Sequence, residues 1–114
     1  MPFCENFHRP INESLLASEA YSTDKSIGSG EIADEVRNEG GSSGLFDKAV
    51  ELGSTKAMFY GHDHRNNAHI TYRGINLCYA MKTGITVYFR FGSLGGVIID
   101  IDRNGKYKID RVYI

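Results

Sequence analysis

Apolar positions recur with two different periods along this chain, and the period changes near residue 54. Before that point, the stretch GLFDKAVELG (44–53) places its apolar residues on one side of a helical wheel. Ser43 precedes this stretch as a candidate cap, and Gly53 follows it as a left-handed stop. INESLLASEAY (11–21) contains helix-forming residues with a shorter apolar stripe. We therefore expect one helix over 44–53 and a second over 11–21.

The carboxy-terminal half has the pattern of strands. Its short apolar or alternating runs are rich in Ile, Val, Tyr and Phe, and they read KAMFY, AHITY, LCYA, TVYFRF, GVIIDI and KYKIDRVYI. Arg73-Gly74 and Asn104-Gly105 are two-residue hairpin signals, because such pairs tolerate the positive φ of a type I′ turn. This half should therefore form a mostly antiparallel sheet.

The segment at about 21–43 is rich in Gly, Ser and charge. A structureless stretch of that length inside a compact domain usually has a functional cause or is disordered. We predict a long, flexible surface loop here.

Length and charge narrow the class of protein. A chain of 114 residues with 41% hydrophobic and 24% charged residues is expected to form one globular unit. Lys and Arg number 13 against 14 Asp and Glu, so no basic field favours nucleic acid as a partner. No apolar stretch approaches the roughly 20 residues that span a bilayer, and no signal peptide is visible, so we expect no membrane partner. The cellular location stays open, with an intracellular one the simpler expectation, and Cys4 and Cys78 are expected to be free thiols.

The candidate chemistry lies at the end of the KAMFY run, where His62 and His64 flank Asp63. If the backbone is extended there, residues two apart point the same way, so both imidazoles would converge on one small volume. Imidazole nitrogen suits Zn, Mn and Fe. A solvent-exposed polar turn is the plainer interpretation of this spacing taken alone. His69, at the start of AHITY, is interpreted as a half-exposed strand histidine rather than a ligand.

A longer stretch is more specific than the histidine pair. KAMFYGHDHRNNAHITYRGINLCYAMKTG (56–84) resembles the closing motif of calcineurin-like metallophosphoesterases, the superfamily that includes the purple acid phosphatases. The matching residues are Gly61, His62, Asp63, His64, Asn66, Gly74, Ile75, Tyr79, Lys82, Thr83 and Gly84. Upstream, FHRPINE resembles the preceding histidine motif of that family through His8, Pro10 and Glu13. Glu5 and Ala80 depart from the family pattern.

The resemblance implies a site and an activity. His8 and His62 would bind one divalent ion of a dinuclear pair and His64 the other, with the identity of the metals (Mn, Zn or Fe) left open. The substrate would be a phosphate ester, attacked by a metal-activated hydroxide, and His62 and His64 would be the catalytic residues. The remaining family motifs, Asp-x-His, Gly-Asp-x-x-Asp and Gly-Asn-His-Asp/Glu, do not occur in this sequence. We therefore expect the carboxy-terminal part of a phosphoesterase domain, truncated and inactive as an isolated chain.

The same resemblance implies the fold. Residues 1–114 would form the carboxy-terminal portion of an α/β (α+β) four-layer αββα sandwich, with mostly antiparallel strands and one or two helices. Such a portion leaves a sheet face uncovered, which predicts self-association or a partner chain. A non-catalytic metal-binding remnant or regulatory module is the alternative. A cupin-like barrel is disfavoured, since residues 65–71 lack the expected Glu.

Overall fold

The computed structural model describes residues 12–36 and 43–114, in which helices and strands alternate irregularly. The elements, in chain order, are α2 (Asn12–Thr23), the 3₁₀ helix η1 (Lys25–Ile27), β1 (Gly28–Ser29), α3 (Leu45–Leu52), β2 (Ala57–Tyr60), β3 (His69–Tyr72), β4 (Ile75–Tyr79), β5 (Gly95–Ile101) and β6 (Tyr107–Tyr113). His8 lies outside the described residues.

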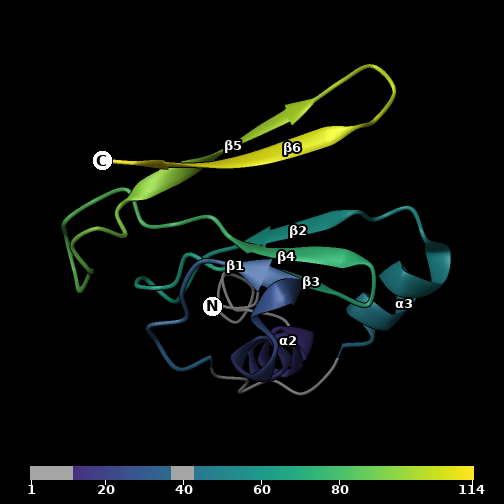
Figure 1. The fold of residues 1–114 in the computed structure, drawn as a ribbon, viewed down its shortest axis with the longest axis horizontal. Coiled ribbons are helices and arrows are strands. Elements are labelled where there is room, and N and C mark those ends of the chain that lie inside the picture. Colours follow the sequence, from purple (N-terminus) through teal and green to yellow (C-terminus); the bar gives the residue numbers. More distant parts are fainter. Residues whose placement is uncertain (1–11, 37–42) are drawn as a thin grey trace.

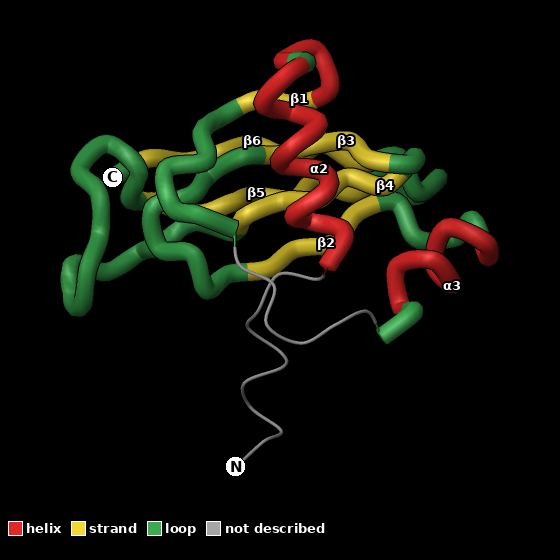
Figure 2. The backbone as a smooth tube through the Cα atoms, turned by 90° about the horizontal axis from the view of Figure 1, so that it is seen from below, coloured by secondary structure: helices red, strands yellow, loops and turns green. Residues whose placement is uncertain are grey.

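The strands form two separate sheets. A four-stranded sheet has the order β1-β3-β4-β2, and β5 pairs with β6 in a two-stranded hairpin. The pairings are antiparallel except for β2 with β4, which is parallel. Helix α2 lies against one face of the four-stranded sheet and the hairpin lies over the other (Figures 1 and 2). The described residues thus confirm a mixed α/β fold with mostly antiparallel strands.

The hydrophobic core lies between the four-stranded sheet and the helices. Successive side chains of a strand point to opposite faces, so Ile75, Leu77 and Tyr79 of β4 point to the helix side, where all three are buried. Ala17 of α2 and Phe46 of α3 close this core from the other side. On the opposite face of β4, Cys78 is a free and fully buried thiol whose pKa is raised by burial to about 11.

Helix α3 confirms the expectation for residues 44–53. Its apolar side buries Phe46 and Ala49. Gly53 ends the helix at φ 71° and its N–H donates to the Ala49 carbonyl at 3.1 Å. Ser43 Oγ accepts from the N–H of Leu45 at 3.3 Å. The second predicted helix is also confirmed, as α2. None of the described helices is long and apolar enough to cross a membrane.

The two predicted hairpin turns differ. Arg73 and Gly74 have φ of 48° and 80°, which confirms the two-residue turn between β3 and β4. Between β5 and β6 the prediction of a two-residue turn is wrong, because the last register pair is Ile101 with Tyr107. Here the Asp102 carboxylate organises a longer turn, since its Oδ1 accepts from the N–H groups of residues 104 and 106 at 2.8 and 2.9 Å.

Two other expectations require correction. The run TVYFRF (86–91) is not a strand but part of a loop from Lys82 to Leu94, which a bridge between those two residues closes. Val87 in this loop has φ 63°, a conformation that no strand residue adopts. The predicted loop 21–43 is wrong at its start, because α2 continues to Thr23 and is followed by η1 and β1. Residues 37–42 of that predicted loop lie outside the described part of the chain.

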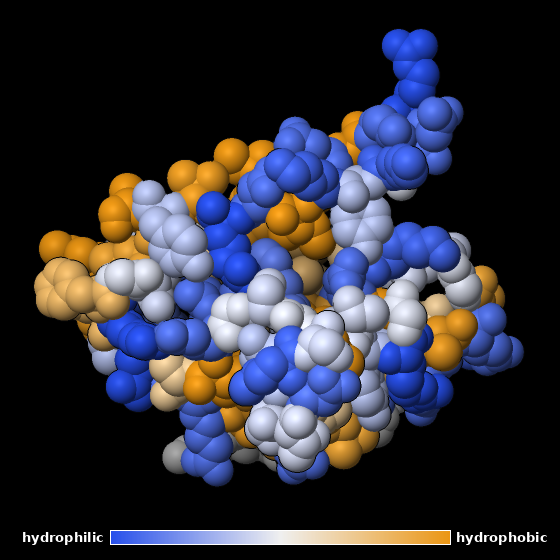
Figure 3. All heavy atoms as spheres, viewed as in Figure 1, coloured by the Kyte–Doolittle hydropathy of each residue, from blue (hydrophilic) through white to orange (hydrophobic). Residues whose placement is uncertain are grey.

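The hairpin side of the molecule carries exposed apolar side chains. The most exposed of them include Ile98, Ile101, Val112 and Ile114, and in the adjoining loop Ile85, Val87 and Phe91. Figure 3 shows hydrophobic residues over this loop and over the part of the hairpin near the C-terminus, whereas the far end of the hairpin is hydrophilic. The hairpin thus covers the sheet without itself being covered.

Candidate histidine site

The histidine turn, which we define as residues 61–66, follows directly after strand β2. His62 has φ 77°, and the N–H of Asp63 donates to the Gly61 carbonyl at 3.1 Å, so His62 is the centre of a tight three-residue turn. The N–H of Asn66 then donates to the Asp63 carbonyl at 3.2 Å. The extended backbone assumed for His62 and His64 does not occur here, so strand alternation does not align their side chains. Positive φ at a non-glycine residue is strained, and such strain is common at functional sites.

His64 is fixed by a residue from far along the chain. Its Nδ1 lies 3.1 Å from the carbonyl oxygen of Tyr88, and the two rings stack with centroids 4.3 Å apart at 17°. A carbonyl oxygen can only accept, so in the neutral ring Nδ1 carries the proton and Nε2 keeps a lone pair. His64 therefore offers Nε2 as the nitrogen for a ligand.

Asp63, between the two histidines, is held by a side chain of the four-stranded sheet. The hydroxyl of Tyr79 donates to Asp63 Oδ2 at 2.7 Å. Burial raises the pKa of the Asp63 carboxyl above its ordinary value, and the Asp34 carboxylate acts in the same direction. The Tyr79 hydrogen bond and the two neighbouring histidines oppose that rise. The carboxylate thus anchors the turn to β4.

The far end of the histidine turn is held to the segment 30–36. Asn66, only 1% exposed, accepts at Oδ1 from the N–H groups of Ala33 and Asp34 at 2.7 and 2.6 Å, and its Nδ2 donates to the Asp34 carbonyl at 3.3 Å. Arg65 donates its backbone N–H to Asp34 Oδ2 at 3.0 Å and forms an ion pair with the same carboxylate at 2.5 Å. The Asp34 side chain is 11% exposed, so this pair is better shielded from water than an ordinary surface pair.

A second set of bonds continues this attachment to the hairpin. Asn67 Oδ1 accepts from the N–H of Glu31 at 2.7 Å, and Arg111 Nε on β6 donates to the Asn67 carbonyl at 2.8 Å. Arg111 Nη2 also donates to Ser29, at both its carbonyl and its hydroxyl, at 2.8 Å. The segment 29–36 and Arg111 of β6, both distant in sequence, therefore fix the chain that follows the histidines.

The described residues do not complete a metal centre. His62 and His64 lie in the same turn, but no group of three His, Cys, Asp or Glu side chains suited to a metal occurs among residues 12–36 and 43–114. His8, the third predicted ligand, lies outside these ranges. A dinuclear centre needs bridging and charge-balancing carboxylates as well as imidazoles, and Asp63 is bound to Tyr79. The described donor set therefore does not fit a dinuclear centre.

Two residues of this site could not be found from the sequence. Tyr88 falls in a run with the pattern of a strand, and Asp34 falls in the segment that the sequence predicts to be a flexible loop. One feature of the sequence could have indicated Asp34, because a long polar segment inside a small domain usually has a functional cause. The part of that segment at 30–36 does hold the histidine turn. His69 lies in β3 as interpreted, partly buried, and its Nε2 has no hydrogen-bond partner among the described atoms.

Two proteins of Arabidopsis thaliana are similar to this chain. One, named probable inactive purple acid phosphatase 29, is 32% identical over 113 residues, which cover 90% of this chain and 26% of that protein. The other, named probable inactive purple acid phosphatase 14, is 47% identical over 53 residues, 46% of this chain and 12% of that protein. The chain thus spans about a quarter or less of the length of these relatives. No family model and no solved structure matches the chain.

Proposed function

Because the chain resembles the carboxy-terminal part of purple acid phosphatase-like proteins, we propose that it is such a part of a phosphoesterase domain and catalyses no hydrolysis alone. Its histidine turn would contribute metal-binding imidazoles to that domain. His62 and His64 are the proposed metal-binding residues in the turn, together with His8. The substrate class of a complete domain would be phosphate esters.

The orientation of His64 is the observation that carries this proposal. Histidine ligands of metals usually donate their other ring nitrogen to a carbonyl or carboxylate, and this fixes the tautomer. Tyr88 accepts that bond from Nδ1, so Nε2 has the lone pair that a metal requires. A histidine that served only as a polar turn residue would not need this second attachment.

The donor set supports the proposal that the isolated chain has no activity. Phosphate-ester hydrolysis at a two-metal site requires two ions held close together, one activating water and both neutralising charge. The histidine turn supplies two imidazoles, and no group of three donors suited to a metal occurs among the described residues. The names of both relatives describe probable inactive proteins, which supports the same conclusion. We therefore assign no hydrolytic step to this chain.

The test is a phosphatase assay of the whole chain with p-nitrophenyl phosphate and added Mn²⁺ or Zn²⁺. We expect no hydrolysis above that of the metal in buffer. A rate that is clearly higher, and that disappears in both His62→Ala and His64→Ala, would show that the chain is an active enzyme. The variant His69→Gln is the matched control, because it removes an imidazole outside the histidine turn.

A further inference from the structure

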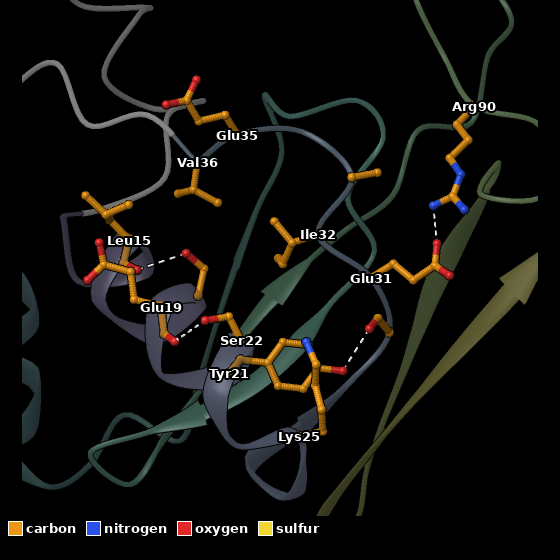
Figure 4. Close-up of a pocket in the computed structure, with 13 residues that line it drawn as sticks. Leu15, Glu19, Tyr21, Ser22, Lys25, Glu31, Ile32, Glu35, Val36 and Arg90 are labelled. Carbon is orange, nitrogen blue, oxygen red and sulfur yellow. Dashed lines mark hydrogen bonds and ion pairs between the residues drawn. The ribbon is translucent and has the colours of Figure 1, made fainter.

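The loop from Lys82 to Leu94 is built to reach the histidine turn. The two ends of this loop are joined by the Lys82–Leu94 bridge, and the N–H of Gly95 donates to the Lys82 carbonyl at 2.9 Å. Arg90, on the same loop, pairs with Glu31, and Figure 4 shows the two side chains pointing toward one another beside a cavity of about 800 Å³. With both ends fixed, the segment between them has few alternative positions.

Tyr88 lies at the part of this loop that meets His64. It contacts the imidazole twice, since its carbonyl oxygen lies 3.1 Å from Nδ1 and its ring stacks 4.3 Å from the imidazole. The guanidinium of Arg65 lies 5.8 Å from the centre of the same tyrosine ring. The carbonyl selects the tautomer, while the ring restricts rotation of the imidazole plane. The two contacts together specify both the chemistry and the direction of His64.

The residue before Tyr88 is strained without a packing reason. Val87 has φ 63°, which is a genuine outlier for a β-branched side chain, and it is 71% exposed. Burial of the Val87 side chain therefore does not offset the strain. Strain of this kind persists where the surrounding structure holds it, and it concentrates at functional sites. Here the strained residue turns the chain directly before the residue that binds His64.

We infer that Tyr88 is a positioning residue, which fixes His64 in the Nδ1–H tautomer so that Nε2 is the nitrogen offered to a ligand. This inference rests on the proposed function for its purpose, because a free Nε2 matters only if something binds there. The tautomer itself is a property of the metal-free chain. It can be measured whether or not the proposed function holds.

The experiment is ¹H–¹⁵N correlation spectroscopy of the histidine rings in the labelled full chain without metal, at about pH 8, where imidazoles are neutral. In the unaltered chain His64 should give the signals of a single Nδ1–H tautomer. Tyr88→Ala keeps the backbone carbonyl but removes the stacked ring that holds the imidazole against it, so the signals should shift toward the Nε2–H form that imidazole prefers in water. Tyr88→Phe should leave them unchanged, because it keeps the ring and the carbonyl. Val87→Gly should also leave them unchanged, since glycine adopts positive φ without strain.

Phe91→Ala is the matched control, because Phe91 is 84% exposed on the same loop and stacks on Phe89 instead. Circular dichroism would show that each variant is folded. An Nε2–H tautomer in the unaltered chain would overturn the inference. So would a tautomer that Tyr88→Ala leaves unchanged in a folded protein, because the backbone carbonyl alone would then fix His64 and the tyrosine ring would have no positioning role.

A second measurement separates this inference from the proposed function. Loss of a residue that orients a metal-binding histidine typically weakens metal binding 10- to 100-fold. We therefore expect Tyr88→Ala to weaken Zn²⁺ binding at least about tenfold relative to Phe91→Ala. If the tautomer is fixed but no ion binds, the proposed function fails while the role of Tyr88 stands. If the unaltered chain binds Zn²⁺, equal Zn²⁺ affinity in the two variants would contradict the role of Tyr88.

Discussion

The four-stranded sheet and the β5–β6 hairpin are both built from short apolar strands, but they differ in what covers them. In β4, Ile75 and Leu77 are at most 2% exposed, because α2 and α3 pack on that face. In β5, Ile99 and Ile101 are 42% and 70% exposed. An apolar strand thus makes a core only where another layer is packed against it. The histidine turn follows the covered sheet, and both regions hold it or its neighbour: Tyr79 on β4 bonds Asp63 within the turn, and Arg111 on β6 bonds Asn67 directly after it.

The largest expected effect is on the covered sheet. Leu77→Ala should lower the free energy of unfolding by about 3 kcal/mol, because it opens a cavity in a site with no exposed surface. Ile101→Ala, the matched change in the hairpin, should cost about 0.5 kcal/mol or less. Urea unfolding of the two variants measures the difference. Equal losses would show that the hairpin is packed as tightly as the sheet.

Acid should destabilise the layer between sheet and hairpin through His69. Burial lowers the pKa of His69 to about 4, and the nearby Arg111 charge acts in the same direction. The unfolded chain has an ordinary histidine pKa of about 6.5, so it binds more protons than the folded chain between pH 6.5 and 4. Stability should therefore fall as pH falls through this window, by at most about 3 kcal/mol.

Urea unfolding at several pH values, compared with His69→Gln, measures this effect. The variant should lose most of the dependence between pH 6.5 and 4. A slope that is the same in both proteins would assign the acid sensitivity to other groups.

The attachment of the histidine turn should contribute a smaller share of stability. Asn66→Ala leaves the N–H groups of Ala33 and Asp34 without their acceptor, which should cost about 2 kcal/mol. Asn104→Ala, in the exposed hairpin turn, is the matched control and should change stability by less than about 0.5 kcal/mol. Equal unfolding midpoints for the two variants would mean that the bonds to the segment 30–36 contribute little.

Local sequence signals were enough for elements whose partners are near in sequence. The helix ending at Gly53 and the turn at Arg73-Gly74 are set by the conformational preferences of a few adjacent residues. TVYFRF has the pattern of a strand, yet no strand among the described residues pairs with it. It lies instead in the loop that the Lys82–Leu94 bridge closes. The parallel pairing of β2 with β4 depends on topology, which alternation does not encode.

The candidate site could be predicted only in part from local sequence signals. The motif predicts His62 and His64 as candidates, because both belong to one short pattern, Gly-His-Asp-His. Their geometry depends on Asp34, 31 positions before Arg65, and on Tyr88, 24 positions after His64. Such pairs form because folding brings distant segments together, so no local pattern predicts them.

The smallest change in stability is expected for a hairpin variant that should alter self-association of the chain. We propose that the exposed apolar side chains of the hairpin make the chain self-associate. Ile101→Lys should leave the unfolding midpoint nearly unchanged, because the side chain is mostly exposed, and should shift sedimentation toward the monomer. A monomer at all concentrations in the unaltered chain would contradict this.

Metal titration of the whole chain by calorimetry tests whether the histidine turn binds a metal ion. We expect Zn²⁺ to bind at one site per chain, to lose that site in His62→Ala/His64→Ala, and to keep it in His69→Gln. The account is contradicted if the unaltered chain gives no heat of binding, or if the double variant binds Zn²⁺ as tightly as the unaltered chain.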